Sequence, residues 1–206
     1  MQKLSLSDLS ITGCGKIFHN LSVPELVTQA ILRGEGMLTD TGALDVMTGK
    51  HTGRSPNDKF IVDSESVHDQ IEWGEINHPI SREHFRLVKC KMHAYLQNKP
   101  LFVFDGYAGA ETESRISFRV VNEYAFQALF AHQLLISPSE SELETFEPEY
   151  TVICAPGFSC IPEFDGVNSE TAIIIDFESK TVLISGDLYC GEIKKSIFTV
   201  MNYELP

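Results

Sequence analysis

The spacing of hydrophobic residues divides the chain into helices and strands that do not strictly alternate. Apolar residues recur every three or four positions in segments that start at Ser22, Ser81, Asn122 and Gly191, which predicts helices. Short apolar or alternating runs predict strands at 43–46, 60–62, 101–104, 116–121, 150–154, 172–177 and 181–184. This mixed order predicts an α/β domain with a mixed β-sheet flanked by helices, rather than a purely parallel, doubly wound sheet.

Polar residues mark where the helices start. Ser22 and Glu25 form a capping-box pattern, and Ser81 begins a helix of about four turns, with Phe85, Val88 and Met92 in its apolar stripe. Two histidines on that second helix, His84 and His93, are nine residues apart, which is not a metal-ligand spacing, so we expect both to be solvated. Asn122 is expected to cap the helix 123–135, and a short acidic helix is expected at 139–144.

The remaining segments are predicted to be irregular. These are the lead-in 1–21, including a glycine-rich turn at 13–16 that lacks the pattern of a phosphate loop, and the polar region 63–79. Residues 178–180 are expected to form a tight connection between two paired strands.

Composition narrows the class of protein. The 206 residues are 43% hydrophobic and 22% charged, as in ordinary globular proteins, and the net charge is −13. An acidic balance argues against a nucleic-acid backbone or an anionic membrane as the main partner. The chain has neither a signal-peptide pattern nor an apolar run near the roughly 20 residues of a membrane span, and its five cysteines form no C-x-x-C pair. We therefore expect a cytoplasmic protein without disulfides or a zinc site.

Two short stretches carry unexpected positive charge. Lys194 and Lys195 stand side by side near the start of the last predicted helix, where cations oppose the helix dipole. The loop 52–60 contains Arg54, whose planar fork of donors suits a carboxylate or phosphate. Each stretch alone is at least as well explained by a solvated turn. Together they indicate a site for an anion or a metal–phosphate complex.

Both stretches, with the tail 198–206, resemble the ATP-dependent phosphoenolpyruvate carboxykinases. That family carries a T-G-R-S-P-x-D-K-aromatic loop and a Y-x-G-E-(I/M)-K-K segment that runs into M-N-Y-x-L-P. Further matches lie at 101–105, 119–125 and 134–139, in the same order. The resemblance covers nearly the whole chain and implies that 1–206 is the N-terminal, substrate-side domain of such an enzyme.

The resemblance implies a reaction and a set of site residues. The family converts oxaloacetate and ATP into phosphoenolpyruvate, ADP and CO2, a step of gluconeogenesis, with Mn²⁺ and with Mg²⁺ bound to ATP. By resemblance, Arg54 binds the substrate carboxylate or CO2, Tyr189 lies against the substrate, Lys194 reaches the transferred phosphate, and Lys195 binds manganese. An amine binds a metal only when neutral, which burial, the neighbouring Lys194, the helix N-terminus and the metal itself would favour.

One pattern of the family is missing. The chain contains no G-x-x-x-x-G-K-[ST] loop, which the family places after M-N-Y-x-L-P, in its C-terminal nucleotide-binding domain. We therefore expect this polypeptide alone to be inactive, to hold no tightly bound cofactor, and to self-associate through surface that the missing domain would cover. Two alternatives stay open: a free-standing, non-catalytic binding domain for phosphorylated or dicarboxylic metabolites, and a structural domain without a working site.

Overall fold

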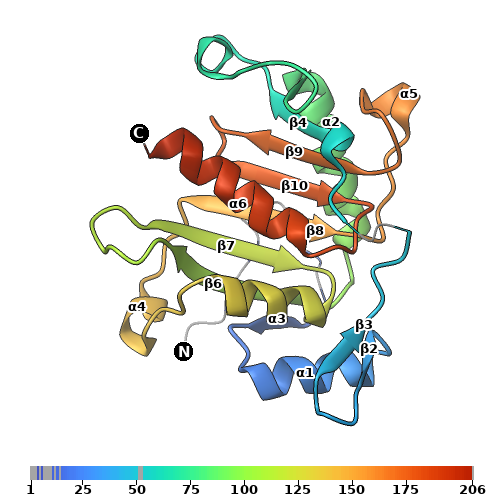
Figure 1. Ribbon diagram of the computed structural model, residues 1–206, viewed down its shortest axis with the longest axis vertical. Helices are drawn as coiled ribbons and strands as arrows, with labels where there is room; N and C mark the ends of the chain where they lie inside the picture. The colour runs from blue at the N-terminus through green and yellow to red at the C-terminus, as the bar shows by residue number, and fades with distance from the viewer. Residues whose placement is uncertain are drawn as a thin grey trace.

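One large mixed sheet forms the centre of the computed structural model, which describes residues 4, 6, 11, 13, 15–50 and 53–205 (Figure 1). The strands of this sheet are β1 (Ile17–His19), β4 (Lys59–Val62), β5 (His78–Ile80), β6 (Leu101–Ala108), β7 (Ile116–Asn122), β8 (Tyr150–Ala155), β9 (Ala172–Asp176) and β10 (Thr181–Ser185). The helices are α1 (Val23–Leu32), α2 (Arg82–Leu96), α3 (Ala125–Leu134), α4 (Glu140–Glu144), α5 (Pro162–Asp165) and α6 (Gly191–Glu204). A separate hairpin pairs β2 (Gly36–Leu38) with β3 (Leu44–Val46). The predicted fold class, a mixed sheet flanked by helices, is confirmed.

The sheet mixes parallel and antiparallel pairs. Its strand order is β1-β6-β7-β8-β10-β9-β4-β5. Two pairs are antiparallel, β6 with β7 and β9 with β10, and the other five are parallel. The predicted tight connection between β9 and β10 is present, and Lys180 in it adopts a left-handed backbone conformation with φ of 49°.

Alternation of side chains along the central strands buries them on both faces of the sheet. Val120 on β7 packs in the core beneath α6, with Ile193 and Ile197 of that helix. Its neighbour Val121 points to the opposite face and packs with Val88 of α2. Both faces are covered, which is why the central strands read as nearly continuous apolar runs.

The predicted helix starts are mostly confirmed. Ser22 and Glu25 form the capping box of α1, and the Ser81 hydroxyl accepts a hydrogen bond from the His84 backbone N–H. Asn122 was wrongly expected to be a helix cap. Its side chain donates instead to the carbonyls of Phe102 and Val120, because it is fully buried between strands, and α3 starts at Ala125.

Other predictions were wrong because tertiary pairing overrode weak local patterns. The lead-in was expected to be irregular but contains β1, and the polar region before α2 contains β5, an edge strand that tolerates Pro79. Part of the glycine-rich turn at 13–16 lies outside the described residues. His93 is 7% exposed rather than solvated, and burial lowers its pKa to about 4.

Strand β9, which runs antiparallel to β10, brings two segments that are distant in the sequence to the same end of the sheet. Ile173 on β9 pairs with Ile184 near the end of β10 and, on its other side, with Lys59 at the start of β4. Since neighbouring strands are about 4.8 Å apart, the start of β4 lies about 10 Å from the end of β10. The loop before β4 and the segment after β10 therefore meet. In the described part of the chain, every helix is too short or too polar to cross a membrane.

Candidate functional site: a cationic cluster at the start of α6

The arginine loop, residues 53–58, is held by its neighbours in sequence and in space. A 3-10 turn covers Pro56–Asp58, and the Asp58 carboxylate accepts a hydrogen bond from the Ser169 hydroxyl at 2.8 Å. The side-chain amide of Asn168 donates to the backbone carbonyl of Asn57 at 2.6 Å. Arg54 itself is exposed, so its guanidinium is available to a ligand from solution.

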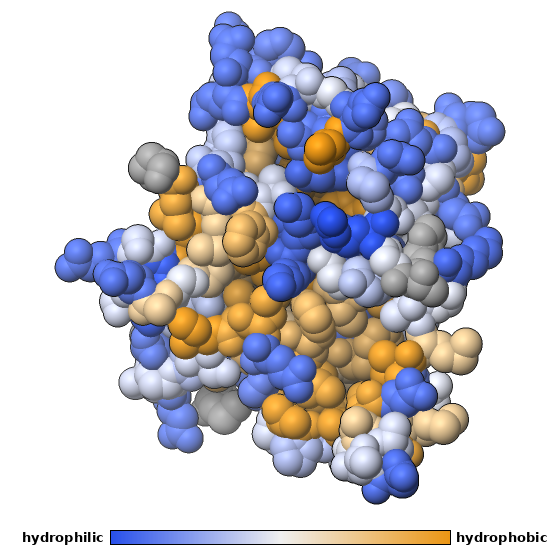
Figure 2. Space-filling view, viewed as in Figure 1, coloured by the Kyte–Doolittle hydropathy of each residue, from blue (hydrophilic) through white to orange (hydrophobic). Residues whose placement is uncertain are grey.

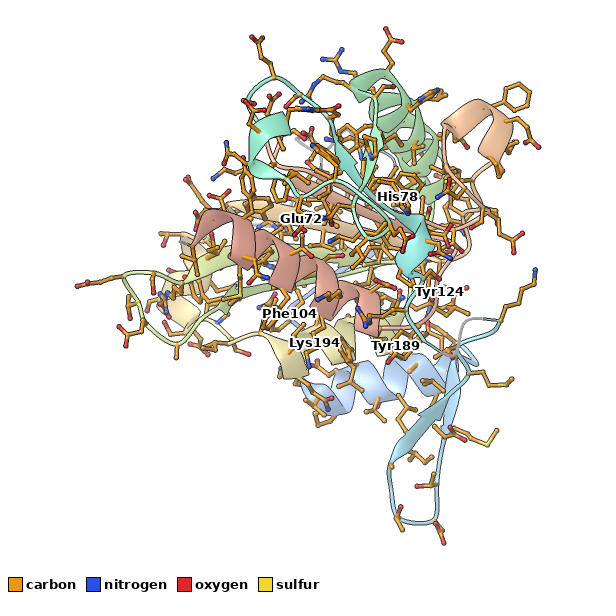
Figure 3. The ribbon with its side chains drawn as sticks, turned by 45° about the horizontal axis from the view of Figure 1, so that its top comes forward. Glu72, His78, Phe104, Tyr124, Tyr189 and Lys194 are labelled. Carbon is orange, nitrogen blue, oxygen red and sulfur yellow. The ribbon has the colours of Figure 1, made fainter. Side chains whose placement is uncertain are left out.

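The segment after β10 turns sharply into α6. The backbone N–H of Tyr189 donates to the buried Asp187 carboxylate at 2.7 Å, which fixes the approach to the helix. A Cβ atom at Gly191 would lie 2.2 Å from Cε1 of the Tyr189 ring, so only glycine lets this half-buried ring lie against the first turn. Figure 3 shows Tyr189 at the beginning of α6.

One buried hydrogen bond joins the two segments. The Ser55 backbone N–H donates to Oε1 of Glu192 at 2.7 Å, across 137 positions of the chain. Burial raises the pKa of Glu192, as does Asp187, whereas the Ser55 N–H and the charges of Arg54 and Lys59 oppose that rise. The carboxylate is therefore enclosed between the arginine loop and the start of α6.

The charges of two expected site residues change the pKa of Lys59. Its pKa is lowered to about 8, first by burial and then by the charges of Lys195 and Arg54, which the charge of Glu192 partly opposes. Its Nζ donates to the side-chain carbonyl of Asn77 at 2.9 Å. We call Arg54, Lys59 and Lys195, with the Glu192 carboxylate, the cationic cluster. Figure 2 shows strongly hydrophilic side chains gathered beside the start of α6, above a broad apolar area.

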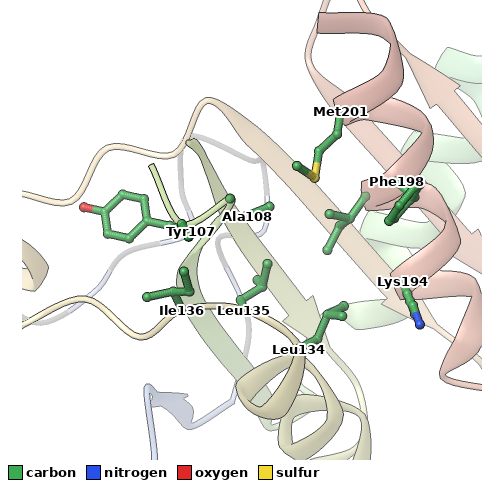
Figure 4. A pocket seen from close by; sticks show the side chains of 11 residues that line it. Tyr107, Ala108, Leu134, Leu135, Ile136, Lys194, Phe198 and Met201 are labelled. Carbon is green, nitrogen blue, oxygen red and sulfur yellow. The ribbon is translucent and has the colours of Figure 1, made fainter. Parts of the chain in front are cut away.

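Lys194 lies on a different side of α6 from Lys195, because consecutive helical residues are about 100° apart. It lines a pocket of about 240 Å³ that neither Arg54, Tyr189 nor Lys195 lines. The other walls are apolar, from Phe198 and Met201 on α6 and from residues 107–110 and 134–136 on the far side (Figure 4). The two lysines therefore face different surroundings.

The structure brings together part of the predicted set. Arg54 and Lys195 share the surroundings of Lys59, and Tyr189 stands at the start of the same helix, whereas Lys194 borders the apolar pocket. Lys195 is exposed, so burial is not among the factors that favour its neutral form. Sequence reasoning missed Lys59 and Glu192. Both stand inside the quoted motifs, but only their burial and contacts distinguish them from solvated charges.

The donor groups of the cluster do not by themselves fit a divalent cation. The described residues contain no group of three or more histidine, cysteine, aspartate or glutamate side chains that could hold a metal. Around Lys59 stand two other cations and one carboxylate, and that carboxylate already accepts a hydrogen bond. Hard divalent cations prefer several oxygen ligands, so we derive no chemical step from a metal held by these residues.

Taken together, the fold and the cluster define an α/β domain with positively charged donors, of the kind that bind small anions, at one end of the interior strands of a mixed sheet. The family model described as phosphoenolpyruvate carboxykinase matches residues 15–206. The chain belongs to this family.

Relatives with a curated name agree with that assignment. The chain is 56% identical over 207 residues to phosphoenolpyruvate carboxykinase (ATP) of Brevibacillus brevis, covering 100% of this chain and 38% of the relative. It is 52% identical over 201 residues to phosphoenolpyruvate carboxykinase (ATP) 2 of Moorella thermoacetica, covering 98% of this chain and again 38% of the relative. The chain thus spans little more than a third of the length of these relatives.

Proposed function

We propose that the cationic cluster binds the carboxylate groups of oxaloacetate and phosphoenolpyruvate, as the substrate-side part of an ATP-dependent phosphoenolpyruvate carboxykinase. The observation that supports the proposal is that the charges of Arg54 and Lys195, from segments far apart in the chain, both lower the pKa of half-buried Lys59. Three cations in one place can hold a dianion or trianion that each alone would bind weakly.

The proposed roles follow from the chemistry of each side chain. Arg54 would hold a carboxylate through two parallel N–H donors, and thereby orient the bond to the departing CO2. Lys59 would stabilise the negative charge of the enolate oxygen as CO2 leaves. Tyr189 would pack its ring edge and hydroxyl against the substrate.

The roles of ATP and the metal ions involve polypeptide that the relatives have beyond the part matched by this chain. We propose that ATP and its Mg²⁺ are held by polypeptide equivalent to the part of the relatives that this chain does not match. A manganese ion completed there would take Lys195 as one ligand, as a neutral amine that has given up the proton it carries in the cluster. Lys194 would reach the transferred phosphate. The cysteines that the structure describes, Cys90, Cys154, Cys160 and Cys190, are free thiols, in keeping with a proposed cytoplasmic location.

Calorimetric titration of the 206-residue chain with phosphoenolpyruvate tests the proposal. We expect binding that weakens at least about tenfold in Arg54→Gln, since a charge-assisted hydrogen bond is worth about 1.5–3 kcal/mol. Arg86→Gln, which removes a charge from an exposed arginine on α2, is the matched control and should bind as the wild type does. Absence of binding, or equal loss in both variants, would contradict the proposal.

A further inference from the structure

A carboxylate stands where an anion is proposed to bind. Glu192 is 5% exposed and lies within electrostatic reach of Arg54 and Lys59, with Lys195 one turn further along its own helix. Its negative charge repels an anionic ligand and reduces the attraction that the three cations create. Attraction of the anion alone would therefore favour a neutral residue at position 192, so we looked for a contact through which Glu192 could favour binding.

The geometry shows what the carboxylate does. Its Oε1 accepts the Ser55 backbone N–H at 2.7 Å, and Ser55 is only 9% exposed. Two further contacts of the arginine loop, from Asn168 to Asn57 and from Ser169 to Asp58, lie on the β4 side of Arg54 and join the loop to the segment before β9. The contact between Ser55 and Glu192 is thus a direct tie from the arginine loop to α6.

We propose that Glu192 is a positioning residue, whose carboxylate fixes the arginine loop onto the start of α6 and so sets the place of Arg54 relative to Lys195. The inference rests on the proposed function, because it assigns Glu192 a part in the same anion site. A buried amide N–H that loses its acceptor is costly. Removing the acceptor should therefore release the loop.

Two substitutions separate position from charge. Glu192→Gln removes the negative charge and keeps an acceptor oxygen, whereas Glu192→Ala removes both. If Glu192 acted only through its charge, both variants would bind phosphoenolpyruvate more tightly than the wild type. If it positions the loop, Glu192→Ala should bind about tenfold more weakly, and Glu192→Gln should bind as tightly as the wild type or more tightly.

Amide hydrogen exchange reads the position of the loop directly, with or without a ligand. We expect the Ser55 amide to exchange at least about tenfold faster in Glu192→Ala and to regain most of its protection in Glu192→Gln. The matched control is Glu35, another buried carboxylate that accepts a backbone N–H, that of Phe126 at 3.1 Å, between other elements. Glu35→Ala should leave the exchange of Ser55 and the affinity unchanged.

The two measurements distinguish failure of this inference from failure of the proposed function. Unchanged exchange at Ser55 in Glu192→Ala would overturn the inference, as would tighter binding by that variant. If the wild-type chain binds no phosphoenolpyruvate, the proposed function fails, while the exchange result still decides whether Glu192 holds the loop.

Discussion

At the scale of single residues, burial separates side chains that look alike in the sequence. Lys59 and Lys195 both belong to charged motifs, yet Lys59 is half-buried and carries the lowered pKa, while Lys195 is exposed. His84 and His93 share a helix, but His93 is one of the buried residues of α2. The chemistry of each residue depends on this difference, so predictions at this scale concern protonation.

Anion binding should weaken as the pH rises through the pKa of Lys59, about 8. Above that pH the amine is mostly neutral and the cluster has lost one positive charge, so the affinity for oxalate should fall by up to about tenfold between pH 7 and pH 9. Oxalate is a suitable probe because it stays fully ionised over this range. Calorimetry at both values measures the change.

Lys59→Arg provides the matched variant, because guanidinium keeps its charge throughout this range. Its affinity for oxalate should be nearly independent of pH. If the affinity of the wild-type protein for oxalate is equally independent of pH, the charge of Lys59 does not contribute to binding.

Stability should fall in mild acid because of His93. Burial first, and then the charge of Lys89, lower its pKa to about 4, below the ordinary value of 6.5. The unfolded chain therefore takes up the proton first, so this contribution to stability is present above pH 6.5 and is lost as the pH falls towards 4. At pH 5 the loss should be about 2 kcal/mol.

Urea unfolding of the wild type and of His93→Leu at pH 7 and pH 5 checks this prediction. The variant should lose less stability than the wild type between the two values. An identical fall in the wild type and in His93→Leu would rule out the assigned role.

At the scale of elements, the first turn of α6 organises the site. Gly191 admits the Tyr189 ring, Glu192 holds the arginine loop, and Ile193 anchors the turn in the core beneath the helix. Three consecutive residues thus have three different partners, which is possible because a helix directs successive side chains to different sides.

Gly191→Ala should disturb binding more than folding. The added Cβ would overlap the Tyr189 ring at 2.2 Å, so the ring must move, whereas alanine is the better helix former of the two residues. We expect phosphoenolpyruvate affinity to fall several-fold and the free energy of unfolding to change by less than about 1 kcal/mol. Calorimetry and urea unfolding measure the two effects. A large loss of stability would show that the ring cannot move aside.

At the scale of the whole molecule, one face remains partly uncovered. The pocket between α6 and β6 is bordered by Phe198, which is 53% exposed, and by Ile136, which is 46% exposed (Figure 4). Apolar area of this kind favours contact with other protein surfaces. We therefore expect the 206-residue chain to self-associate through this face.

Sedimentation over a range of protein concentrations tests the expectation. The average mass of the wild type should rise with concentration, and Phe198→Ser should reduce that rise. Phe164→Ser, which removes a 66% exposed phenylalanine from α5, is the control and should behave as the wild type does. Equal masses for all three proteins would exclude this face as the contact.

The sequence by itself determined the long helices, the central strands and the family. Capping residues such as Ser22 and Ser81 act within a few positions, and period-2 and period-3.6 patterns reflect burial of one face, so both can be read without knowing the fold. The motifs around Arg54 and Lys195 likewise indicated an anion site.

Only the tertiary structure decided how those motifs meet. Strand β9 runs antiparallel to β10 and parallel to β4, so the start of β4 and the end of β10 lie at the same end of the sheet. Nothing local to Arg54 or Glu192 encodes that arrangement. The same holds for β1 and β5, which are strands because a neighbour completes their hydrogen bonds. Contacts between distant segments depend on the whole sheet, which is why Lys59 and Glu192 emerged as site residues only from the fold.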